Sequence, residues 1–178
     1  LLAMTAAGID ALSDGRCQLG LGASGPQVIE GWHGVKYDAP LGRTREIIDI
    51  CREVWAREDK LTHEGKYYAM PLPDGQGTGL GKPLKIIAHP VRPRIPIWVA
   101  SLGPKNVQMT AEVADGWMPI FFDPGKARDV WGADLDAGAA KRDASLGPLQ
   151  ITAGGLLAIG DDVKGVLEFA RPMVALYV

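Results

Sequence analysis

Continuous apolar blocks alternate with amphipathic blocks along the chain, and the two kinds of block predict strands and helices in turn. A short apolar run bounded by turn residues is typical of a strand that is buried on both faces, as is expected of Cys17–Ala23. Four segments are strand candidates: Cys17–Ala23, Pro96–Ser101, Trp117–Phe122 and Leu149–Gly160.

The amphipathic blocks predict helices, and the clearest lies at about Thr44–Glu58. Its apolar residues recur at offsets 0, 1, 3, 4, 7 and 8, which places them on one stripe that faces a core. The stripe consists of Ile47, Ile48, Ile50, Cys51, Val54 and Trp55. Other helices are expected in the apolar opening stretch 1–16, from Pro104 as first residue to about Ala114, over about 124–145, and from near Val163 after the capping pair Asp161-Asp162.

Strands that alternate with helices predict an α/β fold with a parallel sheet, and the strand, helix and strand over 96–122 have the order of a parallel crossover unit. Two parallel folds compete. A doubly wound nucleotide-binding fold needs a helix directly after the glycines of Gly20–Gly25, and the sequence predicts none there. A (β/α)8 TIM barrel needs eight units, so about four units predict part of one.

The domain is therefore expected to be a partial TIM barrel over residues 1–178, with the central and C-terminal units present and the N-terminal strands absent. The first and last residues are apolar and carry no helix or strand boundary signal, which also suggests a segment of a longer polypeptide. A Gly- and Pro-rich insertion is expected at about 60–92, with a small hairpin around Glu64-Gly65.

Composition narrows the classes of partner. Nineteen Lys and Arg against 21 Asp and Glu leave a net charge of −2, too little for a phosphate backbone or an anionic bilayer, so neither nucleic acid nor membrane is expected as a partner. Two cysteines exclude a disulfide framework, and no leader or long apolar run is present, which favours a cytoplasmic location. Cys17 and Cys51 are interpreted as inert core thiols, and the spacing of the histidines predicts no metal site.

The turn Leu102-Gly103-Pro104, between a buried strand and a helix, is a candidate anion site. Free backbone N–H groups and the positive end of the helix dipole attract anions there, and Gly103 allows close approach. Lys105 adds a positive charge, and Ser101 and Asn106 could donate hydrogen bonds or serve as helix caps. The alternative is that the turn is only a tight connection and Lys105 a solvated side chain.

The loop that leaves the first strand is a second candidate site, because barrel enzymes place their chemistry at the C-terminal ends of strands. Glu30 could act as an acid or base, Trp32 as a flat wall for a ring, and His33 as a proton donor. The alternative is that Glu30 and His33 are solvated loop residues.

These segments resemble the luciferase-like monooxygenase superfamily, and within it the oxidoreductases that depend on the deazaflavin coenzyme F420, such as methylenetetrahydromethanopterin reductase. The resemblance is carried by DGRCQLGLGASGPQVIEGWHG, RTREIIDICREVW, GLGKPLKIIAHPVRPRIPIWVASLGPKNVQMTAEVADGWMPIFF and the closing RPMVALYV.

The resemblance implies a barrel of about twice this length that transfers a hydride between coenzyme F420, an 8-hydroxy-5-deazaflavin, and a small organic substrate. Its coenzyme would lie at the C-terminal ends of the strands, with cofactor-binding residues Ser24, Gly25, Leu102, Gly103, Lys105 and Asn106. Glu30 and His33 are the catalytic candidates. A homodimer of the full-length protein is expected, and the segment alone is expected to be inactive.

Two departures bear on the substrate. The sugar-phosphate dehydrogenases of the family have a Glu and an Asn where this chain has Pro26 and Ile29. The same enzymes bind the substrate phosphate through a Thr and a Lys after the DG pair, whereas this chain has the apolar run 119–122 and only a later Lys126. A less polar substrate is therefore expected. Two alternatives stay open: an FMN-dependent monooxygenase on the same barrel, and a non-catalytic relative that acts as a binding subunit.

Overall fold

The computed structural model describes residues 1–155 and 157–176. The predictions that include Leu156, Tyr177 and Val178 fall, at those residues, outside the described part of the chain. The elements are α1 Leu2–Leu12, β1 Leu19–Gly22, α2 Pro26–Gly31, α3 Pro40–Ala56, β2 His63–Glu64, β3 Ala69–Met70, β4 Ile97–Ala100, α4 Pro104–Val113, β5 Gly116–Trp117, α5 Ala127–Ala139, β6 Gln150–Ile151 and α6 Val163–Ala175.

Four strands form one parallel sheet in the order β1-β4-β5-β6. Leu19 pairs with Ile97 across the first two strands, and Trp98 pairs with Gly116 across the next two. The predicted α/β fold with a parallel sheet is confirmed, and so is the parallel crossover from β4 through α4 to β5.

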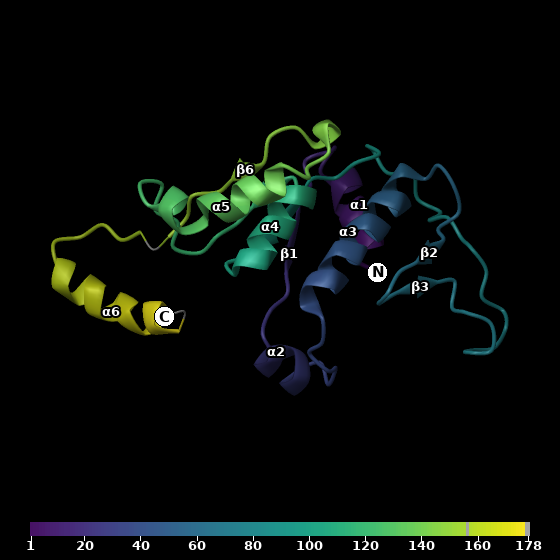
Figure 1. Cartoon of the computed structure of the whole chain (residues 1–178), viewed down its shortest axis with the longest axis horizontal. Helices are drawn as coiled ribbons and strands as arrows, with labels where there is room; N and C mark the ends of the chain where they lie inside the picture. Colours follow the sequence, from purple (N-terminus) through teal and green to yellow (C-terminus); the bar gives the residue numbers. More distant parts are fainter. Residues whose placement is uncertain (156, 177–178) are drawn as a thin grey trace.

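The core lies between one face of this sheet and the helices α1, α3 and α4 (Figure 1). Ile97 and Val99 are almost fully buried on that face, where Leu19 and Leu21 of β1 lie beside them. The core residues on the three helices are Ala3, Ala6, Ala7, Ile48, Cys51, Trp55, Met109 and Val113. The apolar stripe predicted for 44–58 therefore packs as expected, because its period places it on one side of α3.

Three strand predictions need correction. β1 is not buried on both faces: Leu19 and Leu21 are half-buried, whereas Gly20 and Gly22 are exposed because no helix covers that face. β5 ends at Trp117 rather than at residue 122, since Pro119 has no N–H to donate to a ladder. β6 is limited to Gln150–Ile151 within the predicted 149–160.

The five predicted helices hold with shifted ends, but the expectation of no helix directly after Gly20–Gly25 is wrong, because α2 begins at Pro26 with Gly25 as its N-cap. α3 begins at Pro40, four residues before the predicted start, because proline fits the first turn of a helix. Pro104 stands in the first turn of α4 as predicted, and the Asp162 carboxylate caps α6 by accepting the Gly165 N–H at 2.9 Å. α6 lies apart from the sheet and its helices in Figure 1. Among the described residues, no helix combines the length and the apolar character needed to cross a membrane.

The segment between α3 and β4 holds the predicted hairpin, in which β2 and β3 pair antiparallel. Glu46 of α3 anchors it, because its carboxylate accepts the backbone N–H groups of Lys66, Tyr67 and Tyr68 at 2.9 to 3.2 Å. An apolar groove of about 940 Å³ lies between this segment, the start of α1 and α3. None of the residues predicted for the functional site lines it.

Candidate functional site

The loops that carry the predicted coenzyme residues leave the same edge of the sheet. In a parallel sheet the C-terminal ends of neighbouring strands lie side by side, and here Gly22 of β1 pairs with Ala100 of β4. Ser24 and Gly25 follow β1 directly, and Leu102 and Gly103 follow β4. The structure therefore brings the two predicted coenzyme loops to adjacent positions, although they are far apart in the sequence.

The turn into α4 has the features of an anion site. Gly103 is the N-cap, and its carbonyl accepts the N–H groups of Asn106 at 3.0 Å and Val107 at 2.9 Å. The Lys105 N–H has no hydrogen-bond partner among the described residues, and the Lys105 side chain is exposed. Apart from its chain neighbours, no atom of the described residues lies within 4 Å of the point where a Cβ on Gly103 would be, so a side chain there would meet open space.

Ser101 and Asn106, the two polar side chains at this turn, differ in whether they already have hydrogen-bond partners. The Ser101 hydroxyl is buried and shares a hydrogen bond of 2.9 Å with the Thr110 hydroxyl, so it belongs to the packing beneath the turn and not to the anion site. The Asn106 Oδ1 atom is buried and has no partner within the described chain. Rotation of an amide by 180° exchanges its oxygen and nitrogen, so Asn106 can present either a donor or an acceptor.

Two tryptophans, Trp117 and Trp131, donate hydrogen bonds to backbone carbonyls of this turn. The Trp131 indole N–H of α5 donates to the Leu102 carbonyl at 3.0 Å, and the Trp117 indole N–H donates to the Ser101 carbonyl at 2.9 Å. The rings of Trp117 and Trp131 meet edge to face with centroids 5.2 Å apart. The sequence does not predict this role of Trp131, because no local pattern links a residue of α5 to a turn 29 positions earlier.

Tyr37, which no sequence pattern singles out, makes two hydrogen bonds that link residues of the loop after β1. Its hydroxyl donates to the Ser24 carbonyl at 3.2 Å, and its backbone N–H donates to the Glu30 carboxylate at 3.0 Å. Ser24 has a left-handed backbone with φ of 55°, which few residues other than glycine adopt. The Tyr37 hydroxyl thus restrains the strained residue that leads into Gly25, the N-cap of α2.

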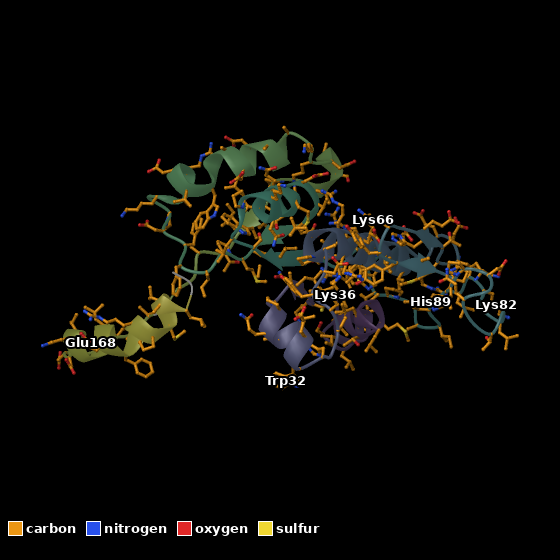
Figure 2. All side chains as sticks on the ribbon, turned by 60° about the horizontal axis from the view of Figure 1, so that its bottom comes forward. Trp32, Lys36, Lys66, Lys82, His89 and Glu168 are labelled. Carbon is orange, nitrogen blue, oxygen red and sulfur yellow. The ribbon has the colours of Figure 1, made fainter. Side chains whose placement is uncertain are left out.

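The residues predicted to be catalytic lie on or just after α2. Glu30 uses its carboxylate to accept the Tyr37 N–H, which is a structural role. His33 is exposed, and no hydrogen bond or ion pair joins its ring to Glu30 in the described structure. Trp32 is 84% exposed and lies at the end of α2 (Figure 2), so its expected role as a wall for a ring stays a prediction.

The cysteines have the surroundings of inert thiols. Burial raises the pKa of the Cys51 thiol to about 11, and burial together with the charge of Asp10 raises the pKa of the Cys17 thiol. A thiol with a raised pKa is a poor nucleophile at neutral pH. Within 1–155 and 157–176, no group of three His, Cys, Asp or Glu side chains is arranged to hold a metal ion.

Comparison with known proteins identifies the family. The model of the family described as luciferase-like monooxygenase matches residues 1–177. The chain belongs to this family. It is 48% identical over 177 residues to a putative coenzyme F420-dependent oxidoreductase, Rv3520c, of Mycobacterium tuberculosis, an alignment that covers 98% of this chain and 51% of that protein.

A second relative and a solved structure agree. The chain is 30% identical over 171 residues to the 5,10-methylenetetrahydromethanopterin reductase of Archaeoglobus fulgidus, covering 96% of this chain and 46% of that enzyme. Its fold is similar to that of a coenzyme F420-dependent tetrahydromethanopterin reductase from Methanopyrus kandleri, with a TM-score of 0.70 at 20% identity, over 98% of this chain and 51% of the other. The chain spans about half the length of these relatives, so the predicted partial barrel fold is confirmed along with the family.

Proposed function

We propose that this chain contributes to a luciferase-like oxidoreductase that transfers a hydride between coenzyme F420 and a small organic substrate. The observation that carries the proposal is the open helix end at Gly103 and Lys105, which lies beside the Ser24-Gly25 loop at the C-terminal rim of the sheet. Two relatives that the chain matches over nearly its whole length are F420-dependent by name or reduce a methanopterin derivative.

The residues at the rim fit the phosphate-bearing arm of such a coenzyme. The Lys105 N–H and the Lys105 ammonium group have no partner in the described structure, and a dianion would accept hydrogen bonds from both, and from the Asn106 amide nitrogen once the amide is turned toward it. When bound, coenzyme F420 donates or accepts a hydride at C5 of its ring. In this proposal the chain binds the phosphate arm at the start of α4 through Leu102, Gly103, Lys105 and Asn106. It orients the ring through Ser24 and Gly25.

Glu30 and His33 remain the candidates for the group that exchanges a proton with the substrate. Both lie on the segment that leaves the C-terminal end of β1, which is the side of the sheet where the coenzyme is proposed to bind. Substitution of each in turn, with separate measurement of coenzyme affinity and turnover, tests this assignment: a proton-transfer residue lowers turnover and leaves coenzyme affinity unchanged.

Titration of the intact polypeptide with coenzyme F420 and, separately, with FMN tests the cofactor. We expect tight binding of F420 and weaker binding of FMN; the opposite order would favour the FMN-dependent monooxygenase, and binding of neither would favour a non-catalytic relative.

The variant Gly103→Asp tests the site itself. It places a negative charge at the helix end, and we expect coenzyme affinity to fall about tenfold or more, since charges at a helix N-terminus change binding by up to about 2 kcal/mol. Gly8→Asp is the matched control, because the position is equally open but lies on α1. Equal affinity for Gly103→Asp and the unchanged protein would remove this cofactor assignment.

A further inference from the structure

A pocket of about 440 Å³ lies at the N-terminal ends of the strands, at the opposite end of the sheet from the proposed coenzyme site. Its lining comes from α3, from the residues just before β4, from the end of α4 and from the segment 141–146 that leads toward β6. Three cationic side chains, those of Arg52, Arg94 and Lys141, line it, and we call it the basic pocket. Its volume lies within the range of pockets that bind small molecules.

Asp115 is the carboxylate that two of these cations share. It accepts a hydrogen bond from Arg52 Nη2 at 3.3 Å, another from Arg94 Nη2, and a third from the Ile97 N–H at 2.9 Å. A single carboxylate balances one of the two guanidinium charges. One positive charge is therefore left over at this point.

The two carboxylates that line the pocket are already engaged. Glu112 receives both Nη atoms of Arg45, at 2.9 and 2.6 Å, and Asp143 accepts the Ser145 N–H at 2.8 Å as the cap of a short 3-10 helix. Arg45 thus balances Glu112, and Asp143 can balance one further cation. The pocket keeps a positive surplus although the chain as a whole has a net charge of −2.

Arg142 lies behind the pocket and shows that positive charge is crowded there. It donates to the carbonyls of Ala111 at 2.9 Å and Ala114 at 2.6 Å, so its own donors serve the end of α4. Burial, together with the charges of Arg94 and Arg52, lowers the pKa of Arg142, and the attraction of Asp115 offsets this only in part. An added anion would relieve the repulsion among these groups.

Several donors of the cations that line the pocket are free. Arg52 donates only through Nη2, to the Val113 carbonyl at 2.7 Å and to Asp115, and its buried Nε has no partner in the described chain. Lys141 is exposed and makes no hydrogen bond or ion pair with the described residues. The rest of the lining includes short apolar side chains, those of Ala56, Pro93, Val113 and Leu146.

We propose that the basic pocket binds a small organic anion that carries a phosphate group. A guanidinium fork matches the geometry of phosphate oxygens, and an ammonium group adds a charge that can follow the ligand. The short apolar residues provide room for a small organic part. The cations converge on one hollow, which fits a compact anion better than an extended chain of phosphates. This site lies apart from the coenzyme site, and the inference does not depend on the proposed function.

Calorimetric titration of the intact polypeptide tests the proposal, with glycerol 3-phosphate as the probe and glycerol as its uncharged counterpart. The Lys105→Glu background is used, because it places a negative charge at the other candidate anion site. We expect saturable binding of glycerol 3-phosphate with a Kd below about 1 mM, and no binding of glycerol. Binding should weaken as sodium chloride is added, since salt screens exposed charges.

Two variants in the same background locate the bound anion. Lys141→Glu reverses a charge at an exposed position without partners, so it should fold normally and weaken binding about tenfold or more. Lys164→Glu is its matched control, with the same change of charge at an exposed position of α6, and should leave binding unchanged. Arg52→Gln should also weaken binding about tenfold or more, with hydrogen exchange in the core showing that the fold is kept.

Any of three results would overturn the inference. The first is the absence of saturable binding of glycerol 3-phosphate, or equal binding of glycerol. The second is unchanged affinity in Lys141→Glu or in a folded Arg52→Gln protein. The third is binding of a single-stranded oligonucleotide that depends on Lys141 and displaces glycerol 3-phosphate, which would assign the pocket to an extended polyanion instead. Failure of coenzyme F420 to bind would contradict the proposed function and leave this inference standing.

Discussion

Asp10 shows how one buried carboxylate joins three parts of the chain. Its side chain has no exposed surface; it accepts hydrogen bonds from the Arg92 guanidinium at 2.7 Å and from the Cys17 N–H at 3.0 Å. The hydrogen bonds from Arg92 lower the pKa of Asp10, although burial acts in the opposite direction. The pair links α1, the start of β1 and the segment that enters β4.

The variant Asp10→Asn is therefore expected to be less stable by about 3 kcal/mol at pH 7, since it leaves the Arg92 charge without a partner. Because the folded pKa lies below the unfolded value of about 3.9, ionised Asp10 stabilises the protein above about pH 4, and this contribution is lost as the pH falls through the folded pKa. Urea unfolding between pH 7 and pH 3 should give a flatter acid limb for the variant. Asp14→Asn is the control, at an exposed turn; an acid limb as steep in Asp10→Asn as in the unchanged protein would contradict the assignment.

At the level of single residues, the sequence identified the groups that form the rim but not the groups that hold them. Gly103, Lys105 and Ser24 lie at strand ends because a strand followed by a turn and a helix is a local pattern. Tyr37 and Trp131 restrain those turns through hydrogen bonds over 13 and 29 positions. No local pattern predicts such contacts, because they depend on how distant segments pack against one another.

The elements differ from their sequence patterns mainly at their ends. The apolar run 117–122 forms a strand only at its start, because the chain turns after Pro119 and Phe121 adopts φ of 55°. Gly116 is needed for a different reason: a Cβ there would lie 2.2 Å from the Trp98 ring of the neighbouring strand. Apolar character thus predicted that this segment is buried, whereas its contacts decided where the strand ends.

The hairpin β2–β3 depends on α3 for its position. The Glu46 carboxylate is nearly buried, which raises its pKa, but the N–H groups of Tyr67, Tyr68 and Lys66 and the His63 ring 3.4 Å away lower it by more. The result is a lowered pKa, so the ionised form holds the hairpin at neutral pH. The attachment is lost as the pH falls through this pKa.

Glu46→Gln removes one of the two acceptor oxygens. We expect hydrogen exchange at the amides of residues 66–68 to become about tenfold faster or more, while exchange in the core residues of α3 stays unchanged, because the hairpin opens locally. Glu53→Gln is the matched control on an exposed position of the same helix. Unchanged exchange at residues 66–68 would show that Glu46 does not anchor the hairpin.

On the scale of the whole molecule, one face of the sheet is covered and the other is open. Helices α1, α3 and α4 bury Ile97 and Val99, whereas Gly20, Gly22 and Ala100 remain exposed on the other face. α6 carries a further exposed apolar surface, with Phe169 81% exposed. The chain spans about half the length of the two relatives named above.

Because one face of the sheet is uncovered, we expect the isolated 178-residue chain to bind coenzyme poorly. It should bind coenzyme F420 at least tenfold more weakly than the intact polypeptide and show no turnover, because open strand edges and half of a pocket hold a ligand poorly. Equilibrium binding and steady-state assays on both proteins, side by side, measure the difference. Turnover by the isolated chain would prove this expectation wrong.

The sequence by itself determined five of the helices, α1 and α3 to α6, together with the α/β class and the family, because these depend on local periodicity and on motifs within short stretches. It also placed the candidate coenzyme residues at the ends of β1 and β4. Only the tertiary structure decided that these two strands are neighbours, that the Asn106 oxygen is left without a partner while the Ser101 hydroxyl is not, and that Asp10 meets Arg92 82 positions away. Such facts arise from packing between distant segments, and the free energy of those contacts is not a property of any one stretch of sequence.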